Sequence, residues 1–388
     1  MRKTLLLSEI FPPQHGGSGR WFWEIYTRLP SEQVTFVVGR YQGDESFDSQ
    51  HHLNLHRIPL SSASWGFRSF EGLRFYFRSW KLLRKYVKHN NIEEVHCGRC
   101  LPEGVIAWLL NLTHGIDYSC YVHGEDIETA ASSRELSLLV RQVLKNSSRL
   151  ICNSQNTASI LSAGWAISDN RITVMHPGVD VDKFTVDQDI RKPPNWDNKT
   201  VILTVGRLQK RKGQDVMIKA LPKILETIPN TLYCIIGDGK EKENLHQLVA
   251  SLDLIDHVEF RDEIKDEEMI ACYQHCDLFA LPNRTVNRDI EGFGIVLLEA
   301  QACGKPVLAG DSGGTKETML VNETGVVVDC SDADNLAIQV SRLLSDKDRL
   351  HAMGASARNH VVTKFRWENL AHEAFSEFSK PPNEKSQT

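Results

Sequence analysis

Short runs of hydrophobic, often β-branched residues alternate along this chain with longer stretches of helical periodicity. In the first half the helical stretches cover Gly19–Leu29, Phe70–His89 and Ser133–Asn146. Around them the pattern predicts strands at Thr4–Leu7, Val34–Val38, Glu94–Cys97, Tyr118–Val122, Leu150–Asn153 and Ile172–Met175. This alternation is typical of parallel α/β layers, because a helix usually makes the crossover between two parallel strands.

The same rhythm begins again near residue 200. Strands are predicted at Val201–Val205, Thr231–Ile236, His257–Phe260, Leu278–Leu281, Pro306–Ala309 and Gly325–Val328. Helices are predicted between them at Gln214–Thr227, Lys240–Leu252, Asp266–Cys276, Ile295–Ala302 and Ala333–Ser345. The pattern therefore predicts an α/β fold of two Rossmann-like, doubly wound domains that face each other across a cleft.

The boundary between the halves is predicted at residues 187–199. This stretch has no hydrophobic periodicity and contains Pro193-Pro194, which disfavours both a helix and a central strand. We therefore expect domains at residues 1–186 and 200–365, joined by a linker. Residues 366–388 are expected to form a C-terminal helix that returns toward the first domain, with a polar, frayed tail after Pro381.

The length and composition fit two globular domains. The chain has 388 residues, of which 41% are hydrophobic and 24% charged, near the averages for soluble proteins. A net charge of −5 gives no reason to expect nucleic acid as a partner, which calls for a basic chain or face. No apolar run approaches the ~18–20 residues of a membrane span. The apolar stretch Leu5–Leu7 is too short for a signal peptide, so we expect a buried first strand and a cytoplasmic protein.

The nine cysteines predict reduced, buried thiols rather than a disulfide framework. Their number is odd, and most lie scattered inside apolar segments. Cys97 and Cys100 have redox or zinc spacing, and Cys272 and Cys276 bracket His275. A zinc site would need two matched pairs, whereas these differ in spacing and lie in different halves. We also interpret two Asp-x-Asp pairs as helix caps or solvated acids rather than metal ligands: Asp180/Asp182 and Asp332/Asp334.

A ligand is expected at the loops that follow the strands, because open α/β sheets bind ligands beyond the carboxyl ends of their strands. After the first strand, residues 12–19 read Pro-Pro-Gln-His-Gly-Gly-Ser-Gly and open a helix. Gly16 and Gly17 would let the backbone approach a ligand, and a helix N-terminus favours an anion. The spacing is neither that of a Rossmann nor of a Walker loop, so a phosphate cradle and a tight turn are both open.

A basic loop follows the first strand of the second half. Residues 206–213 read Gly-Arg-Leu-Gln-Lys-Arg-Lys-Gly, with four basic side chains within six positions. Arg207 could place its guanidinium on two phosphate oxygens, and Lys212 offers a compact charge, so the loop suits a diphosphate. A solvated basic loop is the alternative.

An acidic pair follows a later strand. Glu291 is expected in a loop and Glu299 in the second turn of the next helix, so both could address one ligand. Apolar neighbours surround Glu299, where a lone carboxylate is costly. Sugar hydroxyls could supply its hydrogen-bond donors; pairing with a core Arg or Lys is the alternative. His123, at a strand end before Gly124, could reach a ligand or could fix its own loop.

Together, Gly-Arg-x4-Lys-Gly at residues 206–213 and the Glu-x7-Glu pair resemble the retaining glycosyltransferases of family 4, which adopt the GT-B fold. The run Ile290–Thr318 is most similar to the bacterial phosphatidylinositol mannoside mannosyltransferases. The resemblance covers nearly the whole chain. It includes His176–Asp180, where family members more often have Asn-Gly-Val-Asp.

The resemblance implies a role for each matching residue. Arg207 and Lys212, with Gly213 closing the motif, would bind the donor diphosphate, and Glu299 would hold the ribose. Glu291 and the backbone of the next four residues would contact the transferred sugar, the four being Gly292, Phe293, Gly294 and Ile295. Gly16 and Gly17 would approach the diphosphate from the other domain, and His123 would lie beside the sugar. Phe260 and Ile264 belong to the stretch that frames the base, although Asp262 stands where members often have Gly.

The resemblance also implies a mechanism and a substrate. Transfer would occur on the front face with retention, and the leaving diphosphate would take the acceptor proton. Cationic side chains would replace a metal, so no metal or cofactor is expected beyond the nucleotide-sugar substrate. GDP-mannose is the favoured donor, with UDP-glucose or UDP-N-acetylglucosamine as the alternative, and the acceptor is expected to be lipid-linked or a glycan. A nucleotide-sugar 2-epimerase and a non-enzymatic nucleotide-sugar-binding scaffold are the other classes to consider.

A basic, aromatic helix is predicted within residues 65–88. Tyr76, Trp80, Leu83 and Val87 should form its buried face. Five cations step by four and three positions along another face: Arg74, Arg78, Lys81, Lys85 and Lys88. This face could simply be solvated, or it could attach the protein to an anionic membrane at the inner face of the plasma membrane.

Overall fold

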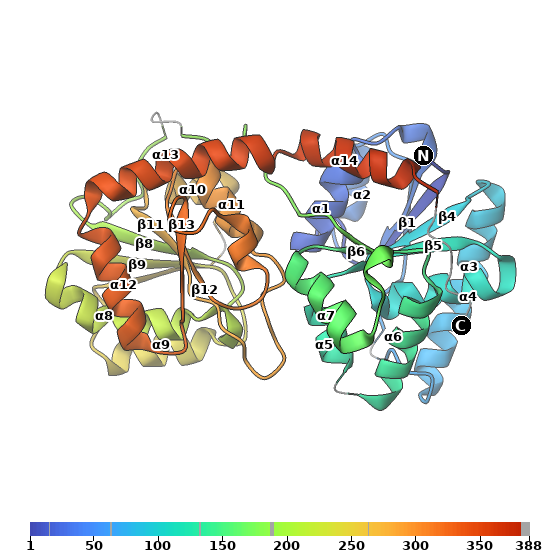
Figure 1. The fold of residues 1–388 in the computed structure, drawn as a ribbon, viewed down its shortest axis with the longest axis horizontal. Helices are drawn as coiled ribbons and strands as arrows, with labels where there is room; N and C mark the ends of the chain where they lie inside the picture. The colour runs from blue at the N-terminus through green and yellow to red at the C-terminus, as the bar shows by residue number, and fades with distance from the viewer. Residues whose placement is uncertain (15, 63, 132, 187–189, 263, 382–388) are drawn as a thin grey trace. The chain divides into compact units, whose positions relative to one another are not determined.

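A computed structural model describes residues 1–14, 16–62, 64–131, 133–186, 190–262 and 264–381. The chain forms two compact units, each built on its own parallel sheet (Figure 1). The first unit contains Met1–Pro177 and Trp367–Thr388, and the second contains Gly178–Arg366. Both therefore have the doubly wound α/β architecture that the alternating pattern predicts.

The first unit contains a seven-stranded parallel sheet with the order β3-β2-β1-β4-β5-β6-β7. Its strands are β1 (Thr4–Ser8), β2 (Val34–Gly39), β3 (Leu55–Ile58), β4 (Glu94–Cys97), β5 (Asp117–Val122), β6 (Arg149–Cys152) and β7 (Ile172–Val174). Its helices are α1 (Gly17–Tyr26), α2 (Asp44–Ser49), α3 (Phe70–His89), α4 (Val105–His114), α5 (Glu125–Ala130), α6 (Arg134–Asn146), α7 (Gln155–Trp165) and α14 (Trp367–Ser379), with shorter helical turns η1 (Ser31–Gln33), η2 (Cys100–Gly104) and η3 (Asp169–Arg171). The strand order reverses between β1 and β4, which makes this point the switch point of the sheet.

Both faces of this sheet are buried. Leu5 and Leu7 join the core layer that also contains α3, α4 and α6, whereas Leu6 joins the layer formed by α1 and α14. Successive side chains of a strand point to opposite faces, so a strand between two helical layers reads as a continuous apolar run. The predicted buried first strand is therefore confirmed. No helix in the described ranges is long and apolar enough to cross a membrane.

The second unit contains a six-stranded parallel sheet with the order β10-β9-β8-β11-β12-β13. Its strands are β8 (Thr200–Val205), β9 (Thr231–Ile236), β10 (Val258–Arg261), β11 (Leu278–Leu281), β12 (Val307–Gly310) and β13 (Gly325–Val328). Its helices are α8 (Gln214–Thr227), α9 (Lys242–Ser251), α10 (Asp266–His275), α11 (Ile295–Ala302), α12 (Ala333–Leu344) and α13 (Lys347–Lys364), with the turns η4 (Lys210–Lys212) and η5 (Thr315–Thr318). Here the switch point lies between β8 and β11.

The predicted linker at 187–199 is wrong in its described part. The boundary falls between Pro177 and Gly178, and Trp196 is fully buried in the core of the second unit. The Trp196 indole Nε1 donates a hydrogen bond to Glu259 Oε2 at 2.8 Å. One buried tryptophan anchors the segment without any periodic pattern, which is why the sequence suggested a linker. Residues 187–189 and the expected tail at 382–388 lie outside the described residues.

The predicted burial of the cysteines and the predicted capping role of the Asp-x-Asp pairs are confirmed. All nine cysteines are buried free thiols. Asp332 caps α12 by accepting a hydrogen bond from the Asp334 backbone N–H, and Asp180 accepts from the backbone N–H groups of Asp182 and Lys183. Among the residues described, no group of three or more His, Cys, Asp or Glu side chains is arranged to hold a metal ion.

Candidate functional site

The switch point of the second sheet brings the basic and the acidic loops together. The basic loop leaves the carboxyl end of β8, and the loop containing Glu291 leaves the neighbouring strand β11. Lys212 Nζ lies 2.6 Å from Glu291 Oε2, and both side chains are about nine-tenths buried. The two motifs therefore meet at the switch point, which is where a ligand of an open α/β sheet is expected.

Glu291 is held by two cations. Besides Lys212, it contacts the Arg211 guanidinium, whose Nε lies 3.0 Å from Asp289 Oδ1. Burial acts to raise the pKa of Glu291, but the charges and hydrogen bonds of Lys212 and Arg211 outweigh it and lower that pKa below its usual value. Glu291 is therefore a carboxylate, and one buried anion is shared by two buried cations. Sequence reasoning noted the basic cluster but assigned no role to Arg211.

Arg207 differs from Lys212 in being exposed. Within the described ranges its guanidinium makes no ion pair or hydrogen bond, while its backbone carbonyl accepts from Gln214 Nε2 at 3.2 Å. The loop thus presents one buried, paired cation and one exposed cation. Such a combination can grip a diphosphate, because an exposed arginine can turn onto phosphate oxygens at little cost.

Two glycines shape this loop. Gly206 continues β8 with a φ of +149°, and a Cβ there would lie 3.8 Å from Lys212 Nζ, so the ammonium lies directly over it. Gly213 has a φ of +76° and precedes α8. A Cβ at Gly213 would lie 1.8 Å from the carbonyl oxygen of Pro282, which follows β11. The two switch-point loops are therefore in backbone contact that only glycine permits.

Helix α11 begins at the same site. Gly294 precedes it with a φ of +89°, and no side chain caps the helix. The first N–H groups of a helix lack intrahelical acceptors, so they favour an anion or a sugar oxygen. The Phe293 side chain is buried in the core near Phe365, so only its backbone could serve a ligand. Gly292 and Ile295 are half-buried beside it.

Glu299 lies in the second turn of α11, as predicted, and is 6% exposed. Its Oε2 accepts a hydrogen bond of 2.7 Å from the hydroxyl of Tyr273 on α10. Tyr273 is fully buried, and sequence reasoning missed it. A tyrosine that holds one carboxylate oxygen orients the group without neutralising it.

A Tyr273→Phe variant tests this orientation. We expect the KM for the nucleotide sugar that the resemblance implies to rise about tenfold with little change in kcat, because Glu299 loses the hydrogen bond that orients it. Tyr233→Phe is the matched control, since its buried hydroxyl donates to Thr204 Oγ1 at 2.9 Å in the same unit. If steady-state kinetics show that neither variant changes the KM, Tyr273 does not orient Glu299 for donor binding.

The residues expected to frame the base lie at the edge strand. Phe260 is half-buried at the end of β10, and its ring stacks on His246 of α9 with a centroid distance of 4.0 Å. Ile264 packs against the core that includes α11. Asp262 pairs with Lys242 at 2.6 Å. Strand β9 separates β10 from β8, and Glu263 lies outside the described residues.

In the first unit, His123 follows β5 and is fixed by its neighbours. Its Nε2–H donates to the Gly98 carbonyl oxygen at 2.7 Å, and its ring lies 5.9 Å from Trp21 and 6.0 Å from Phe22, centroid to centroid. The loop-fixing interpretation is therefore correct for Nε2. The other ring nitrogen makes no hydrogen bond with the described part of the chain, so the two interpretations are compatible.

The glycine-rich loop opens α1. Gly16 precedes the helix with a φ of 169°, which any residue can adopt, and no side chain caps the helix. Gly17 is exposed. The first N–H groups of α1 lack intrahelical acceptors, as at any helix start, and so favour an anion, while His15 lies outside the described residues.

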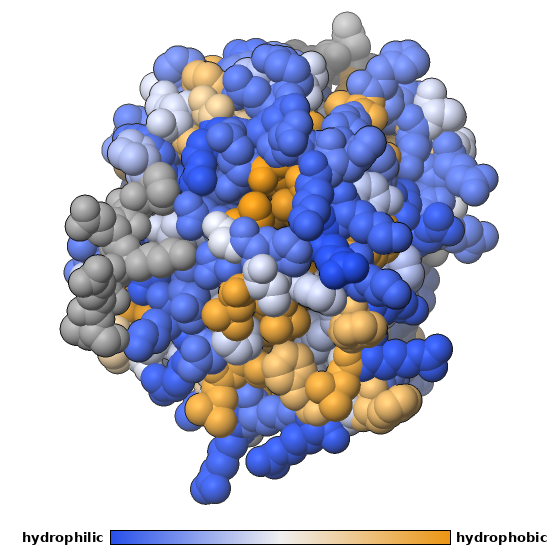
Figure 2. All heavy atoms as spheres, turned by 90° about the vertical axis from the view of Figure 1, so that its right-hand side faces the viewer, coloured by the Kyte–Doolittle hydropathy of each residue, from blue (hydrophilic) through white to orange (hydrophobic). Residues whose placement is uncertain are grey.

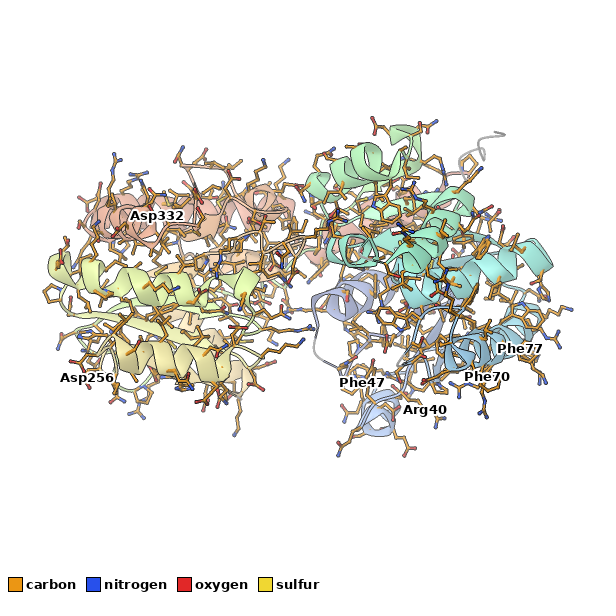
Figure 3. The ribbon with its side chains drawn as sticks, turned by 90° about the horizontal axis from the view of Figure 1, so that it is seen from below. Arg40, Phe47, Phe70, Phe77, Asp256 and Asp332 are labelled. Atoms are coloured by element: carbon orange, nitrogen blue, oxygen red, sulfur yellow. The ribbon has the colours of Figure 1, made fainter. Side chains whose placement is uncertain are left out.

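Helix α3 has the predicted buried face and an exposed face that is both basic and apolar. Tyr76, Leu83 and Val87 are buried and Trp80 is half-buried, whereas the five predicted cations are exposed. Phe70 and Phe77, which Figure 3 labels, are 81% and 62% exposed. Leu73 is also exposed. The side of the molecule that carries α3 shows apolar patches among hydrophilic side chains (Figure 2). We call Phe70, Leu73 and Phe77 the exposed stripe of α3. The sequence did not reveal it, because the hydrophobic pattern alone does not show which aromatic residues the core covers.

Comparison with known proteins identifies the family. The protein-family model described as "Glycosyltransferase Family 4" matches residues 15–183. A second family model, described as "Glycosyl transferases group 1", matches residues 186–360. The GDP-mannose-dependent alpha-(1-6)-phosphatidylinositol monomannoside mannosyltransferase of Mycobacterium tuberculosis is 30% identical over 380 residues, 96% of each chain. The chain belongs to glycosyltransferase family 4. This family 4 enzyme is a hexosyltransferase, as the motifs predicted.

Other relatives agree with this assignment. The GDP-mannose-dependent monoacylated alpha-(1-6)-phosphatidylinositol monomannoside mannosyltransferase of Corynebacterium glutamicum is 30% identical over 95% of each chain. Among solved structures, Anabaena HepE in complex with UDP-glucose has a TM-score of 0.80 at 18% identity, covering 97% of this chain and 99% of that one. Sucrose-phosphate synthase from Thermosynechococcus elongatus has a TM-score of 0.82 at 22% identity, covering 97% and 98%. The fold of the family 4 enzyme is therefore GT-B.

Proposed function

We propose that this glycosyltransferase moves a hexose, with mannose favoured, from GDP-mannose to a lipid-linked or glycan acceptor with retention of anomeric configuration. The observation that carries the proposal is the buried Lys212–Glu291 pair at the switch point, flanked by exposed Arg207. Near-full-length relatives named as GDP-mannose-dependent mannosyltransferases support the choice of donor and of a glycolipid acceptor.

In the proposed reaction the bond between the sugar C1 and the diphosphate oxygen breaks. The acceptor oxygen forms its bond to C1 on the same face, and its proton passes to the leaving diphosphate. Lys212, Arg207 and the N-terminus of α11 stabilise the negative charge that develops on the diphosphate, so neither a metal nor a separate base is required. The contribution of the protein is mainly electrostatic: buried Lys212 is held in place before the reaction, and exposed Arg207 turns onto the diphosphate when the donor binds.

The remaining site residues position the donor in this proposal. Glu299, oriented by Tyr273, accepts hydrogen bonds from the ribose hydroxyls. The charges of Lys212 and Arg211 lower the pKa of Glu291, so this carboxylate is ionised and can accept hydrogen bonds from sugar hydroxyls while both cations stay beside it. Phe260 and Ile264 frame the base, Gly16 and Gly17 bind the diphosphate, and His123 contacts the sugar.

The choice of donor is tested by thermal shift with GDP-mannose, UDP-glucose, UDP-N-acetylglucosamine and an ADP-sugar. GDP-mannose is expected to raise the melting temperature most, because at about 100 times its Kd a ligand adds roughly 2.7 kcal/mol to stability. A larger rise in melting temperature with a UDP-sugar would show that the UDP-sugar, and not GDP-mannose, is the donor. Product analysis distinguishes the other classes, since an epimerase releases an altered sugar without an acceptor and a scaffold turns nothing over.

The exposed face of α3 is proposed to bind an anionic membrane, which would place the enzyme at the inner face of the plasma membrane. Its five cations can each contribute about 1 kcal/mol near an anionic surface. Phe70, Leu73 and Phe77 lie on the first two turns of the same face and can enter the headgroup region. A helix face on which cations surround exposed aromatic residues is better suited to contact with an anionic lipid surface than to full exposure to water.

Flotation with phosphatidylglycerol-containing liposomes tests this surface. Wild type is expected to float, and the triple reversal Arg78→Glu, Lys81→Glu and Lys85→Glu is expected to stay in solution. A matched reversal of three exposed cations in the second unit, at Arg342, Lys347 and Lys364, should float like wild type. Binding by the α3 variant, or none by wild type, would rule the proposal out.

A further inference from the structure

A short hairpin separates strand β11 from Glu291. Residues 284–290 fold back on themselves, because Val286 and Asp289 exchange two backbone hydrogen bonds of 3.1 and 2.9 Å. Asn287 at the tip has a φ of +57°, a left-handed conformation that asparagine tolerates in tight turns. We call this segment the β11 hairpin. Its two ends lie close together, so both can contact one neighbouring loop.

The first end of the β11 hairpin is attached twice to the basic loop at residues 206–213. The Arg284 backbone N–H donates to the Arg211 carbonyl oxygen at 2.8 Å. The Arg284 guanidinium binds Asp215 in the first turn of α8, with Nη1 2.8 Å from Oδ1 and Nη2 3.0 Å from Oδ2. We call this two-point ion pair the clasp. Lys212 lies between the two attachment points in the sequence, so the chain is held on both sides of it.

The clasp has the geometry of a strong ion pair. The side chains of Arg284 and Asp215 are only 20% and 26% exposed, so water screens their charges less than at a free surface. A bidentate arginine–carboxylate pair also fixes the direction of both groups. Lys219 Nζ lies 3.6 Å from Asp215 Oδ2, but it is exposed and makes a single contact. Arg284 is therefore the partner that sets the position of Asp215.

The second end of the β11 hairpin adds a complementary charge. Asp289 Oδ1 lies 3.0 Å from Arg211 Nε. Arg211 and Asp215 on one side thus meet Asp289 and Arg284 on the other, and each cation faces an anion. A shifted alignment of the two segments would bring like charges together, which is unfavourable. The charge pattern therefore selects one register of the hairpin against the basic loop.

The base of the hairpin is itself fixed to the loop that follows β12. Asn283 is fully buried, and its Nδ2 donates to the Ser312 carbonyl oxygen at 2.7 Å. Its Oδ1 accepts from the Gly310 backbone N–H at 3.0 Å. The hydroxyls of Thr285 and Ser312 lie 2.9 Å apart. The hairpin is therefore a supported element from which the clasp can hold another loop in place.

We propose that Arg284 and Asp215 are positioning residues for the transfer reaction, because the clasp holds the Lys212 ammonium where it meets the donor diphosphate. The inference rests on the proposed function, which makes Lys212 the cation at the leaving group. A lysine ammonium is a point charge on a flexible stem, so its backbone must be fixed if the charge is to be in place before the reaction. The clasp supplies this support and acts only through Lys212.

Hydrogen exchange on the full-length enzyme tests the support directly, without any ligand. Asp215→Asn and Arg284→Gln break the clasp from opposite sides, so the test stands if one of the two fails to fold. Exchange of the peptide at residues 206–213 is expected to be about tenfold faster in both variants, because the turn at Lys210–Lys212 loses its support. Exchange of the strands in the second unit should stay as in wild type.

Calorimetric titration with GDP, and in parallel with UDP, tests the link to Lys212. Both clasp variants are expected to bind the nucleoside diphosphate about tenfold more weakly than wild type. In a Lys212→Ala background, breaking the clasp should weaken binding no further, because residues that act through one group are not additive.

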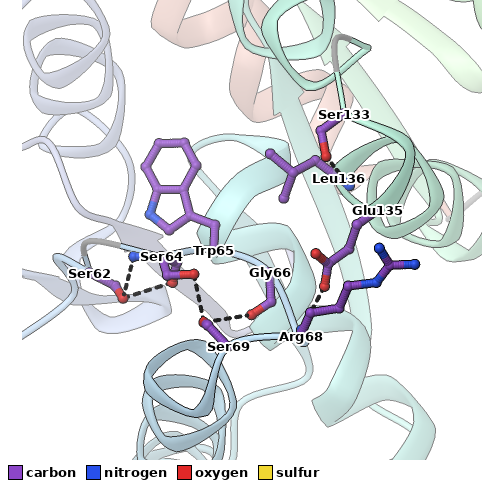
Figure 4. A pocket seen from close by; sticks show the side chains of 9 residues that line it. All are labelled: Ser62, Ser64, Trp65, Gly66, Arg68, Ser69, Ser133, Glu135 and Leu136. Atoms are coloured by element: carbon purple, nitrogen blue, oxygen red, sulfur yellow. Dashed lines mark hydrogen bonds between the residues drawn. The ribbon is translucent and has the colours of Figure 1, made fainter.

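Two controls accompany these measurements. Lys223→Gln removes an ion pair of 3.1 Å with Asp334 and lies on the same helix α8 as Asp215. Glu135→Gln lies at the cavity of the first unit in Figure 4 and removes a carboxylate that accepts from the Arg68 backbone N–H at 2.8 Å. Both controls should keep wild-type exchange in the basic loop and wild-type affinity for the nucleoside diphosphate.

The proposal is supported if the clasp variants exchange faster in the basic loop and lose diphosphate affinity only when Lys212 is present. It is overturned if exchange in the loop is unchanged, if Lys212→Ala weakens binding and the clasp variants do not, or if the two losses add. If the loop exchanges faster but neither the clasp variants nor Lys212→Ala weaken binding, the clasp still positions the loop, and the diphosphate role of Lys212 in the proposed function fails.

Discussion

A Lys212→Ala variant is expected to lose transfer activity by about 10²–10³-fold or more in kcat, because it removes a fixed cation from the leaving diphosphate. Lys212 is nine-tenths buried, where water screens its charge little. The loss should appear in kcat as well as in kcat/KM, since the charge on the diphosphate grows as the glycosidic bond breaks. Rates of GDP release with acceptor present measure the effect.

Lys210→Ala is the matched control for this experiment. Lys210 belongs to the same loop but is exposed, so its removal should leave kcat nearly unchanged. The fold of the Lys212→Ala variant should survive, because Glu291 keeps Arg211 as its cation after the substitution. The melting temperature checks this. A Lys212→Ala protein with a near-native melting temperature and undiminished turnover would refute the leaving-group role.

A Gly213→Ala substitution is expected to cause the largest loss of stability of any single methyl addition discussed. The new Cβ would lie 1.8 Å from the Pro282 carbonyl oxygen, so the loops after β8 and β11 would have to separate. A left-handed backbone adds roughly 1–2 kcal/mol for a non-glycine residue, and the clash should bring the total above about 4 kcal/mol. The melting temperature and donor binding should fall together, because these loops form the site.

Gly115→Ala isolates the backbone contribution. Gly115 has a φ of +67° and open space around the added methyl group. Its variant should therefore lose only the roughly 1–2 kcal/mol of the left-handed conformation. Calorimetric unfolding of the two variants compares them directly, and equal losses would show that the Pro282 contact does not matter.

The predictable part of the fold consists of strands buried on both faces. β1, β2, β8 and β9 are almost entirely covered, so each appears in the sequence as a mostly apolar run that a helix pattern follows. The short edge strand β3 is mostly half-buried and lacks such a run, so the sequence did not reveal it. The linker prediction failed because a single side chain, Trp196, anchors an aperiodic segment.

The candidate site was predictable as motifs but not as contacts. Spacing placed Glu291 in a loop and Glu299 in the second turn of a helix, because local geometry depends on neighbours in the chain. The pairing of Arg211 with Glu291 joins residues 80 positions apart, and the order of strands in the sheet decides it. Tyr273 carries no motif and is recognised only by its hydrogen bond to Glu299.

The first unit shows the same limit. His123 could be chosen from its position at a strand end, but its bond to the Gly98 carbonyl depends on the neighbouring strand β4. The Glu9, Arg99 and Glu103 cluster assembles from two strand ends that adjoin only in the sheet. Charged residues far apart in sequence therefore form sites that a single sequence does not disclose.

We propose metal-independent, retaining transfer in which Lys212 and Arg207 stabilise the leaving diphosphate. The most direct test is transfer from GDP-mannose to vesicles of phosphatidylinositol monomannoside in excess EDTA, with the anomeric configuration of the new linkage read by NMR. We expect an α-linked mannosyl product, formed at the same rate with and without EDTA. A β-linked product, or activity that EDTA abolishes and a divalent metal restores, would contradict it.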